Sequence, residues 1–183
     1  MRMTLLTIFA LVGINFSMNA AESVLDIPLK DIDGKKTSLK KLKGSAYLIV
    51  NVASKCGQTP QYSGLERLHR KFKDRGLIVV GFPSNDFGEQ EPGTEAEIKQ
   101  FCSSRYQVTF RMFSKVKVRP GKEQHPLYSA LTGKQSAKPG QVGWNFEKIL
   151  VGKDGKVIAR FESYVEPDEA EFVQAVEKAL AAR

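Results

Sequence analysis

Cysteine and histidine are scarce in this chain of 183 residues, which contains two of each. Two cysteines do not make a disulfide framework for a domain of this size. The histidines, His69 and His125, do not stand at metal-ligand spacing from either cysteine, so no metal site is expected. Cys56 and Cys102 are also too far apart to form Cys-x-x-Cys, the usual pair of a dithiol oxidoreductase, so that activity is disfavoured.

Long apolar runs are missing too, and the one near the start, residues 5–14, is too short for a typical membrane span. A positive residue precedes this run and the small pair Ala20-Ala21 follows it, which is the layout of a secretory signal peptide. We predict a signal peptide over residues 1–21, a mature domain over residues 22–183 and export to the periplasm or the exterior. Because Met18 stands where a small residue is preferred for cleavage, an uncleaved membrane anchor is the alternative.

Acidic residues are outnumbered by basic ones, and the formal net charge is +8. Lysines gather at Lys30, Lys35, Lys36, Lys40, Lys41 and Lys43. Such a patch can attract nucleic acid or anionic lipid. The lysines are not interleaved with aromatic stacking residues and no nucleic-acid motif is present, so we interpret the patch as a solvated face and predict no nucleic-acid partner.

The first cysteine follows an apolar run, residues 47–52, that predicts a buried strand. Thr59 and Pro60 then predict the N-cap and first residue of a helix. Cys56 would therefore lie in the loop before a helix N-terminus, where free N–H groups and the helix dipole favour an anion such as a thiolate. Cys56 is a candidate nucleophile. A buried structural cysteine, or half of a structural disulfide, is the alternative.

The remaining pattern alternates strands and helices. We predict a hairpin around Asp33-Gly34, a helix over residues 60–74, a strand over 77–82, a helix over 95–106 with a Thr94–Glu97 capping box, a short strand over 109–113, a short helix over 126–131, a hairpin of residues 146–151 and 157–162, and a last helix from Pro167. Two fully apolar strands joined by a helix imply a parallel pair covered on both faces. The order predicts a thioredoxin-like α/β fold, with a central mixed sheet flanked by helices.

Three polar side chains can meet Cys56 in this fold. Gln90 lies in the loop after the second apolar strand, and Trp144 and Asn145 directly precede the closing hairpin. Loops that follow parallel strands leave at the same edge of a sheet. Amide and indole groups donate hydrogen bonds without carrying charge, so they can hold a thiolate and a polar oxygen substrate. Taken singly, each has an ordinary interpretation, as a loop, core or turn residue.

Three motifs carry a family resemblance: Asn-Val-Ala-Ser-Lys-Cys-Gly at 51–57, Phe-Gly-Glu-Gln-Glu-Pro-Gly at 87–93 and Trp-Asn-Phe at 144–146. Together they make the chain resemble glutathione peroxidases that have cysteine in place of selenocysteine, over about residues 24–180. The resemblance implies a peroxidase that needs no metal or organic cofactor. Its catalytic residues would be Cys56, Gln90, Trp144 and Asn145.

Cys102 stands where the thioredoxin-dependent branch of that family carries its resolving cysteine. The resemblance therefore implies that Cys102 converts a Cys56 sulfenic acid to a disulfide, which a thioredoxin-like protein reduces. A disulfide needs Cα atoms within about 7 Å, so we expect the helix that carries Cys102 to unwind locally first. The alternatives are a glutathione-dependent peroxidase with Cys102 as a bystander, a peroxide-sensing relay protein, and a purely structural Cys56–Cys102 bridge.

The resemblance carries further expectations. The short segment between residues 113 and 143 is similar to that of monomeric members, so we predict a monomer with an open site. Such a site would admit hydrogen peroxide and organic or lipid hydroperoxides, with a membrane only as the source of the lipid substrates. Ser84 and Asp86 stand where the family usually has Cys and Gln. An inward carboxylate would disfavour the Cys56 thiolate, and we expect Asp86 to face solvent.

Overall fold

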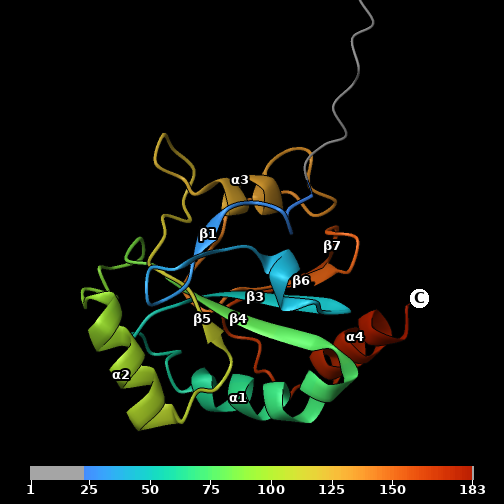
Figure 1. The fold of residues 1–183 in the computed structure, drawn as a ribbon, viewed down its shortest axis with the longest axis horizontal. Coiled ribbons are helices and arrows are strands. Elements are labelled where there is room, and N and C mark those ends of the chain that lie inside the picture. Colours follow the sequence, from blue (N-terminus) through green and yellow to red (C-terminus); the bar gives the residue numbers. More distant parts are fainter. Residues whose placement is uncertain (1–22, 183) are drawn as a thin grey trace, which may run out of the picture.

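The structure is a computed structural model that describes residues 23–182, so the predicted signal peptide lies outside the described residues. At its centre is a five-stranded sheet with the order β5-β4-β3-β6-β7 (Figure 1). The strands are β3 (Ala46–Val52), β4 (Leu77–Pro83), β5 (Arg111–Met112), β6 (Lys148–Gly152) and β7 (Val157–Phe161). The first three are parallel, β6 is antiparallel to β3, and β7 is antiparallel to β6. The predicted thioredoxin-like α/β fold with a mixed sheet is confirmed.

Helices and a small hairpin cover both faces of the sheet. They are α1 (Gln61–Phe72), α2 (Glu95–Tyr106), α3 (Pro126–Thr132), α4 (Ala170–Ala181), the short 3-10 helices η1 (Leu39–Leu42) and η2 (Lys73–Arg75), and the hairpin of β1 (Leu29–Lys30) and β2 (Lys36–Thr37). Leu48 and Val50 of β3 pack into one core with α1, α2 and α4. Tyr47 and Ile49 point the other way, into a core with α3 and η1. Figure 1 shows α1 and α4 below the sheet and α3 above it.

Three loops meet at one edge of this sheet. Because β3 and β4 are parallel and Val52 pairs with Pro83, their carboxyl ends finish together. The segment before β6 reaches the same edge, since β6 is antiparallel to β3 and the Phe146 N–H donates to the Asn51 carbonyl at 2.6 Å. The sheet therefore gathers the segments that carry Cys56, Gln90 and Trp144.

The predicted starts of β6 and α4 are wrong, and the backbone explains both. β6 begins at Lys148 rather than at residue 146, because Phe146 adopts a left-handed conformation (φ 65°) that a strand does not tolerate. α4 begins at Ala170 rather than at Pro167, because the preceding Glu169 is extended (φ −61°, ψ 139°). The Thr94–Glu97 capping box is confirmed, since local side-chain chemistry decides it.

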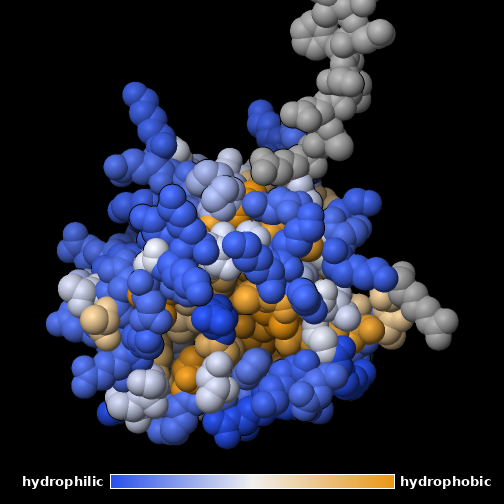
Figure 2. Space-filling model, in the orientation of Figure 1, coloured by the Kyte–Doolittle hydropathy of each residue, from blue (hydrophilic) through white to orange (hydrophobic). Residues whose placement is uncertain are grey.

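The surface is mostly polar. Figure 2 shows hydrophilic residues over most of this face, around a depression where hydrophobic residues show. Among the described residues, the exposed large hydrophobic side chains are Trp144, Ile158 and Tyr164. No helix within residues 23–182 is long and apolar enough to cross a membrane. Trp144 therefore stands out as an exposed indole at the edge where the three loops meet.

Candidate active site

Cys56 lies in the loop between β3 and α1, as the sequence predicts, and is 9% exposed. Its thiol is free within the described residues. The Gln58 N–H donates to Cys56 Sγ at 3.4 Å. The loop therefore supplies a backbone hydrogen-bond donor to the sulfur of the candidate nucleophile.

The Thr59 hydroxyl closes this loop. Its Oγ1 accepts a hydrogen bond from the Cys56 N–H at 3.0 Å and donates one to the Ala53 carbonyl at 2.9 Å. The prediction that Thr59 caps α1 is wrong: the N-cap is Pro60, and the hydroxyl turns back to the Cys56 N–H instead of forward into the helix. Thr59 therefore fixes the backbone on both sides of the candidate nucleophile.

Gln90 and Asn145 come together at the same edge. Asn145 Nδ2 donates to Gln90 Oε1 at 3.0 Å, and the Gln90 carbonyl accepts the Lys55 N–H at 3.0 Å. Lys55 directly precedes Cys56 in the chain. The structure thus brings together the loops of three predicted site residues, while their catalytic roles stay predictions.

Trp144 is held by a hydrogen bond to its backbone carbonyl and by packing of its indole on a phenylalanine ring. Its carbonyl accepts a hydrogen bond from Asn51 Nδ2 at 2.9 Å, and its indole packs on Phe87 with ring centroids 5.4 Å apart. The side chain is nevertheless 41% exposed, so the indole can contact a substrate from solvent.

A charged clamp that sequence reasoning missed supports this loop. Glu147 Oε2 accepts the Gly143 N–H at 2.8 Å, and Glu147 also forms a buried ion pair with Arg160 of β7. Arg160 Nη1 donates to the Lys138 carbonyl at 3.1 Å. The only local signal would have been a charged residue at the start of an otherwise apolar strand.

We expected Asp86 to face solvent, and this prediction is wrong: its side chain is 5% exposed. Its Oδ2 accepts the Val118 and Arg119 N–H groups at 2.6 and 3.0 Å, and Lys117 Nζ lies 3.1 Å from Oδ1. Burial alone would raise the pKa of Asp86, but these partners outweigh it and hold the pKa below its usual range. Asp86 therefore anchors the segment after β5.

Cys102 lies on α2, is 2% exposed, and is free in the part of the chain that the structure describes. Burial raises the pKa of its thiol to about 11, with Glu91 adding to the rise and the nearby Tyr62 hydroxyl opposing it. Ile98 and Cys102 are the buried residues of the twelve in α2. Few buried contacts favour local opening, so α2 is suited to the unwinding that we predict.

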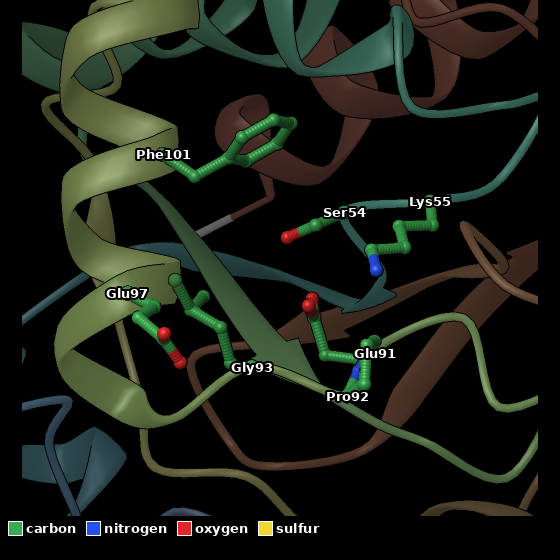
Figure 3. A pocket seen from close by; sticks show the side chains of 8 residues that line it. Ser54, Lys55, Glu91, Pro92, Gly93, Glu97 and Phe101 are labelled. Atoms are coloured by element: carbon green, nitrogen blue, oxygen red, sulfur yellow. The ribbon is translucent and has the colours of Figure 1, made fainter.

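A hollow of about 410 Å³ separates the Cys56 loop from α2 (Figure 3). It is lined by Ser54, Lys55, Glu91, Pro92, Gly93, Glu97, Ile98 and Phe101.

No group of three or more His, Cys, Asp or Glu residues in the described range is placed to hold a metal. His125 instead caps α3, with its Nδ1 accepting the Leu127 N–H at 3.2 Å.

Comparison with known proteins gives a consistent picture. Residues 24–132 match the family described as "Glutathione peroxidase". The chain is 44% identical to the Escherichia coli (strain K12) "Thioredoxin/glutathione peroxidase BtuE", over 87% of this chain and 98% of that protein. It is 48% identical to the Synechocystis "Hydroperoxy fatty acid reductase gpx1", over 75% and 85%. The crystal structure of "Trgpx in apo form" aligns with a TM-score of 0.64 at 34% identity, covering 86% of this chain and 97% of that one.

Proposed function

Since the chain belongs to the glutathione peroxidase family and is a peroxidase, we propose that it reduces hydroperoxides at Cys56 and resolves the product with Cys102. The observation that carries the proposal is the loop geometry: a backbone N–H points at the Cys56 sulfur, and the Gln90–Asn145 pair is bonded to the same loop through the Lys55 N–H. This arrangement suits a thiolate and a polar oxygen ligand together.

The proposed reaction has two steps. The Cys56 thiolate attacks one oxygen of the hydroperoxide, the O–O bond breaks, and Cys56 becomes a sulfenic acid as water or an alcohol leaves. Gln90, Asn145 and the exposed Trp144 indole would orient the peroxide and stabilise the developing charge. Cys102 then condenses with the sulfenic acid to give a disulfide and water.

The reductant and substrate are part of the proposal. The name of the Escherichia coli relative includes thioredoxin and glutathione, and the name of the Synechocystis relative includes hydroperoxy fatty acid. We propose a thioredoxin-like reductant, with hydrogen peroxide and organic or lipid hydroperoxides as substrates, acting on a monomeric enzyme. The proposed site of action is the periplasm or the exterior, reached through the signal peptide over residues 1–21. The second candidate, a glutathione-dependent enzyme, is favoured by the burial of Cys102, which would leave that residue a bystander.

One experiment separates these candidates. The reduced protein is mixed with one equivalent of cumene hydroperoxide, and free thiols and intact mass are followed. Loss of both thiols and of two hydrogens is expected. The Cys102→Ser variant should consume one equivalent of peroxide and then stall in thioredoxin-driven turnover, while Cys56→Ser should not react. Full thioredoxin-driven turnover by Cys102→Ser would refute the two-cysteine cycle and bring glutathione forward.

A further inference from the structure

Glu91 is a buried carboxylate that lines the hollow between the Cys56 loop and α2, the helix that carries Cys102. Its side chain is 0% exposed. Neither of its oxygens has a hydrogen-bond partner among residues 23–182. Ser54 is close enough to lower the pKa of the carboxyl without reaching bonding geometry. A carboxylate buried in this way is costly, so an unpartnered one calls for a role.

The carboxylate points into the hollow between the Cys56 loop and α2. Figure 3 shows Glu91, Ser54 and Phe101 directed into this space from three different segments. Phe101 directly precedes Cys102 in α2. Cys56 and Cys102 also belong to one hydrophobic core, and the hollow lies between the loop that carries the first and the helix that carries the second.

The resolving step needs a base at this place. The pKa of Cys102 is about 11, so only about one thiol in ten thousand is ionised near pH 7. The thiolate is the nucleophile in disulfide formation. The charge of Glu91 contributes to that raised pKa, and Glu91 lines the same hollow as Ile98 and Phe101, which lie on the turn of α2 before Cys102. The groups that interact electrostatically with Glu91 are Ser54, Lys55, Tyr62, Cys102 and Lys115, and Glu97 lines the same hollow.

We propose that Glu91 is the general base of the resolving step, which rests on the two-cysteine function proposed above. As the Cys102 turn of α2 loosens into the hollow, Glu91 takes the thiol proton. The Cys102 sulfur attacks the sulfur of the Cys56 sulfenic acid, the S–O bond breaks, and Glu91 returns the proton to the leaving hydroxide. One disulfide and one water form; the Cys102 sulfur is oxidised and the Cys56 sulfur is reduced.

Burial suits Glu91 to this role. Desolvation raises the pKa of its carboxyl, against the opposing pull of Ser54, Lys115 and Lys55. A base whose pKa approaches the working pH transfers protons most effectively. While no sulfenic acid is present, burial keeps Cys102 a thiol, with a smaller contribution from this negative charge, and so protects it from direct oxidation.

The test uses Glu91→Gln, which keeps the shape of the side chain and removes the base. Peroxide is added to the reduced protein, the reaction is quenched with a thiol-alkylating reagent, and sulfenic acid and disulfide are quantified by mass. Disulfide formation at pH 7 should fall by about a hundredfold, with sulfenic acid accumulating. In this variant the rate should rise about tenfold per pH unit toward the pKa of Cys102, whereas the wild-type rate should level off. Glu91→Asp should recover part of the rate.

The matched control is Glu89→Gln, an exposed glutamate two residues earlier in the same loop, which should behave as the wild type. A Glu91→Gln rate equal to the wild-type rate, or one reduced equally at every pH, would overturn the base assignment and leave the two-cysteine cycle intact. Absence of the Cys56–Cys102 disulfide in the wild type would instead overturn that cycle, and this inference with it.

Discussion

Replacing Thr59 by valine tests how the nucleophile is held. The substitution keeps the side-chain shape but removes the hydroxyl that accepts from the Cys56 N–H and donates to the Ala53 carbonyl. All three residues are buried, so water does not readily replace the lost partners. Each of the two lost hydrogen bonds contributes about 1 kcal/mol to the free energy of unfolding. Counted instead as desolvation, the Cys56 N–H and the Ala53 carbonyl each cost about 1–3 kcal/mol when they are left buried without a partner. Because these figures overlap, we expect a loss of about 2–4 kcal/mol in the free energy of unfolding.

Two measurements check this. Urea unfolding of the reduced protein gives the free energy, and the melting temperature should fall by about 2–4 °C per kcal/mol. The second-order rate of Cys56 oxidation by hydrogen peroxide should fall by about ten- to a hundredfold, because the loop no longer fixes the sulfur.

Two controls make the result specific. Thr59→Ser keeps the hydroxyl, so its peroxide rate should stay close to the wild-type rate, with about 1 kcal/mol of stability lost for the missing methyl. Thr132→Val removes another buried hydroxyl, which donates to the Tyr128 carbonyl within α3, and should leave the rate unchanged. A Thr59→Val protein within about 0.5 kcal/mol of the wild type that reacts at the wild-type rate would refute the reasoning.

The remaining predictions concern Asp86 and the leader. Asp86→Ala should lower the free energy of unfolding by about 2–4 kcal/mol at pH 7, because the Val118 and Arg119 N–H groups lose their acceptor. The pKa of Asp86 is lowered on folding, so this contribution is present above the unfolded pKa and is lost as pH falls through the folded one. Urea series from pH 7 to pH 3 should therefore show the two proteins converging, and a constant gap would contradict the assignment. For the predicted leader, N-terminal sequencing of the protein recovered from the cells that make it should begin near Ala21 or Glu22, and an intact Met1 would favour the anchor.

Features decided by local chemistry could be predicted from the sequence. The apolar runs gave β3 and β4, and Thr94 with Glu97 gave the start of α2. Strand direction then brought Gln90 and Asn145 to one edge, where the structure finds their side chains in contact.

Features decided by distant partners could not. Asp86 is buried because backbone N–H groups more than thirty residues away reach its carboxylate, and backbone donors leave no mark in a sequence. Thr59 can cap a helix or close a loop with the same hydroxyl, and only the position of the Cys56 N–H decides between them. Glu91 reads as one more loop carboxylate until its burial is known.

The lone tryptophan has an optical consequence. The chain contains one tryptophan, and it stands beside Phe87 at the edge of the sheet that carries Cys56. Indole emission from this protein therefore arises at a single point, with no background from a second fluorophore of its kind. Because Trp144 is partly exposed and its backbone is hydrogen-bonded to Asn51, a shift in the surrounding loops changes the contact of the indole with water. The protein carries its own spectroscopic probe, and its emission can be followed in real time without any label.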